Sequence, residues 1–167
     1  ILLGLSAGTE EGVVATVYFL IVYAFSNLGA FGVIAIVSVA TGKENIDDYK
    51  GFYKTNPALS WVMAISLFSL AGIPPTAGFF GKMFLMSAGA ASENYWLIGF
   101  AALNMVISLY YYLRVIKSIF IDQNEDPIPK LNASSSLKFG LLLCFIGILI
   151  TGFTSGLYDY ILNAFNF

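Results

Sequence analysis

The sequence of 167 residues contains no histidine and a single cysteine. Zinc, iron-sulfur clusters and haem are held mainly by these two residue types, so the chain has almost nothing to ligate them, and one cysteine cannot form an internal disulfide. A catalytic triad that uses histidine is excluded for the same reason. Eight Lys and Arg against ten Asp and Glu give a net charge of −2. Without a basic excess to neutralise phosphates, the sequence predicts no nucleic acid partner.

Charged residues of either sign are scarce, at 11% of the chain, whereas apolar residues make up 58% and the mean hydropathy is +0.80. Soluble domains carry about a quarter charged residues. Four apolar stretches reach the roughly 18 residues that crossing a bilayer requires. The sequence therefore predicts an all-α integral membrane protein, with one transmembrane region over 1–167 in contact with the lipid bilayer and helices at about 13–40, 58–91, 95–121 and 139–162.

The start of the chain suggests a missing upstream part. The first residue is Ile1 rather than Met, and the opening ILLGLSAG is too short to span a membrane. We expect the chain to be a piece of a longer polypeptide whose first residues are the end of a fifth helix. The first complete span is expected to follow Thr9, because its hydroxyl can cap a helix with Glu10 and Glu11 in the first turn.

The positive charges are distributed asymmetrically over the loops between the expected spans. Seven of the eight Lys and Arg residues lie in or beside the loops 42–57 and 122–138, which four consecutive spans place on the same side. The opposite side, including the turn 92–94 and the C-terminal tail, has none. The positive-inside rule predicts that both loops are cytoplasmic and that the C-terminus lies on the other side.

The second apolar stretch is too long for one straight helix. At about 34 residues it would reach about 51 Å, well beyond a hydrocarbon core of ~30 Å. Its middle contains two adjacent prolines, which lack N–H donors, between glycines. We predict a discontinuous helix, broken near 72–78, of the kind that forms ion sites in transporters, with a plain proline kink as the alternative. The residues assigned to the break are Gly72, Pro74, Pro75, Thr76, Gly78 and Gly81.

Lys82 is the eighth positive residue, and it lies inside a span. A charged lysine at the bilayer centre costs roughly 2.5–3.5 kcal/mol on insertion scales, so such residues are usually functional. The alternatives are a side chain that reaches the interface and a structural ion pair. About two helical turns separate Lys82 from the turn at Ser92, which disfavours the first. A lysine in a low-dielectric site can load and release a proton near neutral pH, whereas arginine stays charged.

Several sequence motifs resemble one known family. LAGIPPTAGFFGK (70–82), with the preceding SLFS, is similar to the C-terminal part of the subunit N family of bacterial proton-pumping NADH-quinone oxidoreductase, complex I. YAFSNLGAF (23–31), IDDYKGFYKTNP (46–57) and NMVISLYYYLRV (104–115) resemble the same family in the same order. The resemblance covers about residues 1 to 120, and the last helix is matched only by its position.

The resemblance implies the C-terminal part of a 14-helix antiporter-like subunit in the bacterial cytoplasmic (inner) membrane, with a periplasmic C-terminus. Lys82 then occupies the position of the family's proton-loading lysine in a broken twelfth helix. The partners implied are the missing N-terminal helices of the same polypeptide and the other membrane subunits of complex I. The resemblance also implies no cofactor in this chain, because NADH, flavin, iron-sulfur clusters and quinone bind to other subunits.

Three further polar residues within the spans are candidates for lining a channel. Asn27 lies mid-span among glycines, where a close helix contact with an interhelical hydrogen bond is the alternative. Asn104 and Ser108 are four residues apart and therefore share one helix face. This face either borders a water path or packs against a neighbouring helix.

These observations lead to one functional hypothesis with two rivals. We expect a proton-translocating membrane subunit of NADH-quinone oxidoreductase, part of a translocase, with Lys82 as the proton relay and no redox chemistry in this chain. The nearest rival is a subunit of a sodium/proton antiporter or membrane hydrogenase with the same fold. A rival of another class is a structural scaffold subunit in which Lys82 forms a static ion pair.

Overall fold

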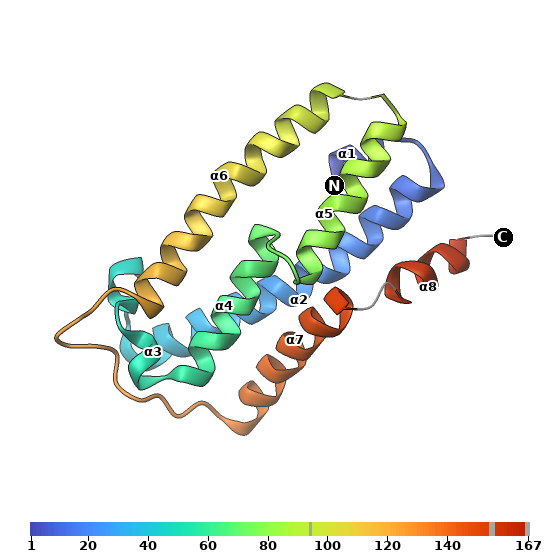
Figure 1. The fold of residues 1–167 in the computed structure, drawn as a ribbon. Helices are drawn as coiled ribbons and strands as arrows, with labels where there is room; N and C mark the ends of the chain where they lie inside the picture. Colours follow the sequence, from blue (N-terminus) through green and yellow to red (C-terminus); the bar gives the residue numbers. More distant parts are fainter. Residues whose placement is uncertain (94, 154–155, 166–167) are drawn as a thin grey trace.

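The structure, a computed structural model, describes residues 1–93, 95–153 and 156–165 (Figure 1). Every regular element within these ranges is a helix. α2, α6 and α7 are long and apolar enough to cross a membrane, and α4 is a shorter apolar helix. The helices are α1 (Leu2–Ser6), α2 (Glu10–Thr41), the 3-10 helix η1 (Ile46–Tyr49), α3 (Phe52–Thr55), α4 (Pro57–Ala71), α5 (Ala77–Ala91), α6 (Tyr95–Phe120), α7 (Ser135–Phe153) and α8 (Gly156–Phe165).

α2 is the central helix of the bundle and packs against α1, α4, α5, α7 and α8. It begins where the sequence predicted, because the Thr9 hydroxyl accepts a hydrogen bond from the Gly12 N–H at 3.1 Å and two glutamates occupy the first turn. It ends at Thr41, and the next residue, Gly42, has a φ of +69°, in the left-handed region that glycine adopts most easily. Its 32 residues correspond to about 48 Å, so α2 forms the axis along which the other helices are arranged.

The predicted interruption of the second span lies between α4 and α5. α4 ends at Ala71 and α5 begins at Ala77, and Figure 1 shows α5 continuing towards the far end of the molecule from the point where α4 stops. The break is shorter than expected, since Gly78 and Gly81 lie within α5. These two glycines serve close packing instead: a Cβ on Gly78 would meet the Ser69 carbonyl, and one on Gly81 would meet Phe19.

The last expected span, 139–162, differs from the observed helices. α7 begins earlier, at Ser135, where the Ser134 hydroxyl accepts from the Leu137 N–H at 3.4 Å, and it ends at Phe153. α8 follows as a separate helix, and residues 154–155 between them lie outside the described residues. α8 packs Ile161 against α2 beside Val14 and Tyr18, which anchors the end of the chain on the central helix.

Two apolar clusters hold the bundle together. One joins the C-terminal half of α2 to α4, η1, α3, the end of α6 and residues 121–134 between α6 and α7, the long loop, around Phe52, Ile119 and Ile128. The other joins the N-terminal half of α2 to α5 and α8. The long loop is tied to the α3–α4 corner by Asn56, which donates to the Pro129 carbonyl at 3.0 Å and accepts from the Leu131 N–H at 2.8 Å. The site described below lies between the two clusters.

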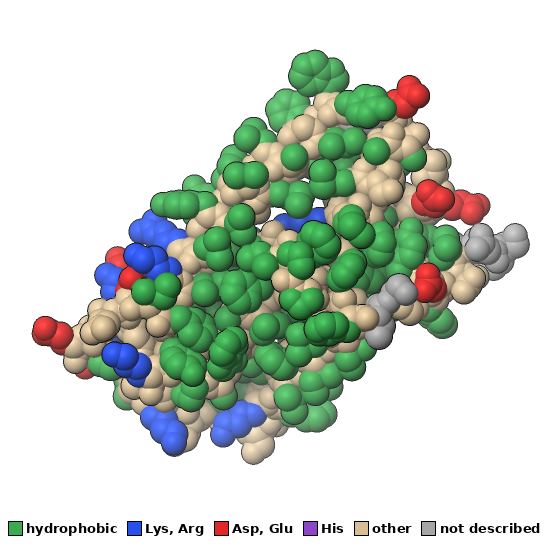
Figure 2. Space-filling view, viewed as in Figure 1, with side chains coloured by type: hydrophobic (Ala, Val, Ile, Leu, Met, Phe, Trp, Pro, Cys, Tyr) green, Lys and Arg blue, Asp and Glu red, His purple; other side chains and the backbone are tan. Residues whose placement is uncertain are grey.

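The surface has the polarity expected of a membrane protein. Figure 2 shows apolar side chains over the middle of the visible face, with Lys and Arg gathered at the end where α3 and the long loop lie. Acidic side chains occupy both ends. The outward side of α6 is apolar and exposed, with Trp96 at 84% and Val106 at 67% exposure, as a surface facing lipid or further helices requires.

Candidate functional site

The break leaves two main-chain acceptors unpaired at the end of α4. In a continuous helix the carbonyls of Leu70 and Ala71 would accept from the N–H groups four residues later, but those positions are Pro74 and Pro75, which have none. The N–H groups that follow α4 bind an earlier carbonyl instead. The Gly72 N–H donates to the Phe68 carbonyl at 2.9 Å, and the Ile73 N–H donates to the same carbonyl at 3.0 Å. The two prolines therefore expose two specific carbonyls.

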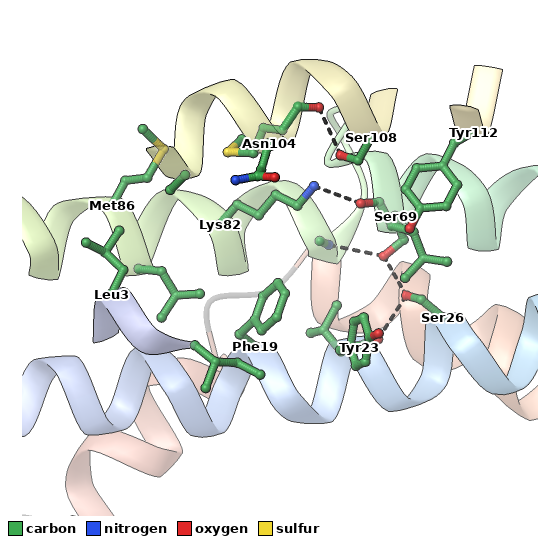
Figure 3. A pocket seen from close by; sticks show the side chains of 17 residues that line it. Leu3, Phe19, Tyr23, Ser26, Ser69, Lys82, Met86, Asn104, Ser108 and Tyr112 are labelled. Atoms are coloured by element: carbon green, nitrogen blue, oxygen red, sulfur yellow. Dashed lines mark hydrogen bonds between the residues drawn. The ribbon is translucent and has the colours of Figure 1, made fainter. Parts of the chain in front are cut away.

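Lys82 fills both vacancies. Its Nζ donates to the Leu70 carbonyl at 2.7 Å (Figure 3). It also donates to the Ala71 carbonyl at 2.9 Å. The C-terminal end of a helix carries partial negative charge, so an ammonium group is stabilised there without a carboxylate. Among the described residues Lys82 makes no ion pair; the two pairs seen are Lys50–Asp47 and Lys117–Asp122 at the surface. An ammonium has three donors, so one N–H of Lys82 remains after both carbonyls are bound.

Gly72 gives the lysine stem the room it needs. Its φ of +82° turns the chain out of α4, and a Cβ at this position would lie 2.9 Å from Cδ and 3.3 Å from Nζ of Lys82. Carbon atoms pack at about 3.5–4.0 Å, so a side chain here would displace Lys82. Glycine at position 72 is therefore favoured by the backbone conformation, and the absence of a side chain there leaves Lys82 in its present position.

Lys82 borders an open cavity of about 400 Å³ lined by α1, α2, α4, α5 and α6. That volume holds on the order of ten water molecules at about 30 Å³ each. Figure 3 shows Lys82 extending across the space from α5, with α6 on one side and α2 on the other. Apart from Lys82, the polar lining consists of Tyr23, Ser26, Ser69, Asn104, Ser108 and Tyr112.

Two of the polar residues proposed from the sequence as channel-lining border this cavity, and one does not. Asn104 and Ser108 both line it from α6. Asn27 does not, and its side-chain amide donates back to the Tyr23 carbonyl of its own helix at 2.8 Å. Its neighbour Ser26 lines the cavity instead, because consecutive residues of an α-helix point about 100° apart.

The remaining residues assigned to the break close the connection between the helices. Thr76 precedes α5, and its hydroxyl donates to the Ile73 carbonyl at 2.7 Å. Ser69 is the site residue that the sequence reasoning missed: it is 1% exposed, lines the cavity and accepts a hydrogen bond from the Gly78 N–H at 3.2 Å. A hydroxyl in an apolar helix, five residues before a double proline, was the available signal.

Comparisons with known proteins bear on the same region. A profile of the family described as "NADH:quinone oxidoreductase/Mrp antiporter, TM" matches residues 1–108, which include the break, Lys82 and most of the cavity lining. The chain belongs to this family. Membership in the NADH:quinone oxidoreductase/Mrp antiporter family confirms the resemblance inferred from the motifs around the break, and it agrees with the all-helical, apolar structure.

Individual members of the family are similar over almost the whole chain. The chain is 46% identical over 160 residues to "NADH-quinone oxidoreductase subunit N" of Phocaeicola vulgatus, covering 95% of this chain and 34% of the relative. It is 45% identical over 163 residues to the protein of the same name from Azobacteroides pseudotrichonymphae, covering 96% of this chain and 34% of the relative. It is 38% identical over 165 residues to "NAD(P)H-quinone oxidoreductase subunit 2" of Synechococcus elongatus, covering 93% of this chain and 32% of the relative. The chain thus spans about a third of the length of the curated relatives it matches.

Proposed function

We propose that this chain is the C-terminal part of a proton-translocating subunit of NADH-quinone oxidoreductase and that Lys82 is its proton-relay residue. The observation that carries the proposal is the position of Lys82, which caps the broken end of α4 and borders a cavity large enough for water. The names of the similar relatives support the assignment to this complex. The family profile includes the segment that contains the site.

The hydrogen bonds of Lys82 explain how the residue can exchange a proton without disrupting the break. A protonated lysine has three N–H donors and a neutral amine has two. Two donors are the number needed by the carbonyls of Leu70 and Ala71, so both remain paired in either protonation state. The third proton is the one exchanged with water in the cavity. Arginine cannot take this role, because its guanidinium stays protonated.

The proposal assigns the remaining chemistry to partners. NADH oxidation, flavin, iron-sulfur clusters and quinone reduction belong to other subunits of the complex. The rest of the proton path is completed by N-terminal helices of the same polypeptide and by neighbouring membrane subunits, which cover the exposed apolar side of α6. The protein is a multi-pass protein of the bacterial inner membrane. The loops that join α2 to α4 and α6 to α7 face the cytoplasm and the C-terminus faces the periplasm, as the distribution of Lys and Arg favours.

A sodium/proton antiporter subunit is the second candidate, because the family description names the Mrp antiporters beside the oxidoreductases. The two functions differ in their driving force. Proton transport that requires NADH oxidation supports the oxidoreductase, whereas sodium-driven proton exchange in the absence of NADH supports the antiporter. The named relatives favour the oxidoreductase.

The experiment that tests the proposal replaces Lys82 by methionine in the native complex. NADH-driven proton uptake is measured in inverted membrane vesicles and normalised to electron flow and to the amount of assembled complex. We expect fewer protons per electron, or a joint fall of pumping and turnover, with assembly unchanged. Unchanged pumping by the assembled variant would refute the relay role, and loss of assembly alone would favour a scaffold.

A further inference from the structure

Two buried hydroxyls lie beside the helix break and are hydrogen-bonded to each other. Ser26 on α2 and Ser69 on α4 are each 1% exposed, and their Oγ atoms are 2.8 Å apart. The Ser26 Oγ also lies 2.8 Å from the Val22 carbonyl oxygen of its own helix, so the single hydroxyl hydrogen has an acceptor on either side, and these contacts fix the orientation of the side chain. Figure 3 shows both side chains at the end of the cavity towards which Lys82 extends.

The hydroxyl of Ser69 connects the two halves of the broken helix. It accepts a hydrogen bond from the Gly78 N–H in the first turn of α5, at 3.2 Å. The first N–H groups of a helix have no partner within it, and the side chain of Thr76, which precedes α5, does not cap them. Ser69 therefore supplies from α4 the cap that α5 lacks, and the close approach is possible because Gly78 has no side chain.

The Ser69–Gly78 hydrogen bond lies close along the chain to both Lys82 and its acceptors. Ser69 directly precedes Leu70, the first of the two carbonyls that Lys82 binds, and Gly78 lies one helical turn before Lys82 on the same helix. A change in the separation of Ser69 and Gly78 shifts the backbone of Lys82 relative to the end of α4, because only about one turn of helix separates Gly78 from Lys82. Because hydrogen bonds weaken steeply with misalignment, a small displacement is sufficient to weaken the capping of α4.

We infer that Ser69 is a positioning residue for Lys82, acting through Gly78 and held in place by Ser26. The inference rests on the proposed relay role of Lys82 and adds the groups that set its geometry. Ser69 exchanges no proton itself. Its contribution is to keep the last carbonyls of α4 and the lysine at the separation that the two short hydrogen bonds require.

The chain offers a matched control for the test. Ser66 lies one turn earlier on α4 and is 0% exposed, so it is as buried as Ser69. Its hydroxyl has no hydrogen-bond partner among the described residues and lies against Gly29. Ser66→Ala removes the same atom from the same helix without removing a hydrogen bond, whereas Ser69→Ala removes the link to both Ser26 and Gly78.

The experiment measures protons translocated per electron for both variants in the assembled complex. We expect Ser69→Ala to lower coupled proton translocation about fivefold, the factor that one buried hydrogen bond typically contributes, and Ser66→Ala to leave it unchanged. Ser69→Thr retains the hydroxyl and should restore translocation. Equal translocation by the Ser69→Ala and Ser66→Ala variants would overturn the inference, as would a failure of the threonine variant to exceed the alanine variant.

A combination with Lys82→Met separates this inference from the proposed function. If Ser69 acts through Lys82, Ser69→Ala causes no further loss in the Lys82→Met background, and an additive loss overturns the inference. If Lys82→Met itself pumps normally, the relay proposal fails, whatever the result at Ser69. If Ser69→Ala prevents assembly, Ser26→Ala is the milder variant, because it removes the Ser26–Ser69 hydrogen bond but leaves the bond between Ser69 and Gly78 in place. Lowered translocation by that variant supports the inference and wild-type translocation overturns it.

Discussion

Replacing Gly72 by alanine tests whether contact with Lys82 matters apart from the shape of the backbone. The substitution has two separable effects. First, the backbone at Gly72 has a left-handed φ of +82°, a conformation that costs an L-residue about 1–2 kcal/mol. In addition, the new Cβ would lie 2.9 Å from Lys82 Cδ, so the side chain must withdraw by about 0.6 Å to reach normal carbon contact.

Gly42→Ala is the control for the first effect. Gly42 also ends a helix with a left-handed φ, of +69°, but a Cβ there has nothing within 4 Å. Both variants should therefore lose similar stability from the backbone, measured as the rate of thermal inactivation of the solubilised complex. Only Gly72→Ala shifts Lys82 away from the carbonyls of Leu70 and Ala71, to which it binds at 2.7 and 2.9 Å.

Hydrogen bonds to a charged group contribute about 1.5–3 kcal/mol each, so partial loss of two of them predicts a tenfold or larger fall in coupled turnover for Gly72→Ala. The assay is NADH-driven proton uptake per electron in inverted vesicles, normalised to assembled complex. Gly42→Ala should retain the wild-type ratio. The reasoning is refuted if both variants pump with the same ratio of protons to electrons.

Two further predictions concern the loops. Asn56→Ala removes two hydrogen bonds to the long loop, at Pro129 and Leu131. This change should raise the rate of limited proteolysis in that loop about five- to hundredfold. The control is Asn132→Ala, a change at an exposed residue of the same loop, which should leave the rate of proteolysis unchanged. The ammonium of Lys50 holds the pKa of the Asp47 carboxyl below its usual value. The pair therefore stabilises the folded state at pH values above the pKa of an unfolded aspartate, near 4. This contribution is lost as the pH falls through the lowered pKa of Asp47. Because the pair is exposed, Asp47→Asn should change thermal stability only slightly at pH 7 in physiological salt, and a large change would contradict this assignment.

The helices and the break could be predicted from the sequence because they follow from local chemistry. Apolar length and the Thr9 cap determine α2, and adjacent prolines cannot continue a helix, so the interruption before Lys82 was predictable. The division of the last span into α7 and α8 was not predicted, because the whole segment is apolar enough to read as one helix.

The arrangement of the site was only partly predictable. Lys82 and the shared face of Asn104 and Ser108 follow from burial cost and helical spacing. The choice of Ser26 over Asn27 depends on which face of α2 meets α4, and that rotation is set by tertiary packing. The contact of Ser69 with Gly78 joins residues from different helices across the break, and sequence spacing alone does not predict such contacts.

The most direct test of the account compares Lys82→Arg with Lys82→Met in the assembled complex, with proton uptake measured per electron transferred. Arginine retains donors for the carbonyls at the end of α4 but cannot release its proton. Methionine has neither an N–H donor nor a proton to exchange. The account predicts that arginine supports assembly and that both variants lose coupled proton translocation at this site. Wild-type translocation by the arginine variant would contradict it, because a permanently charged group would then be sufficient.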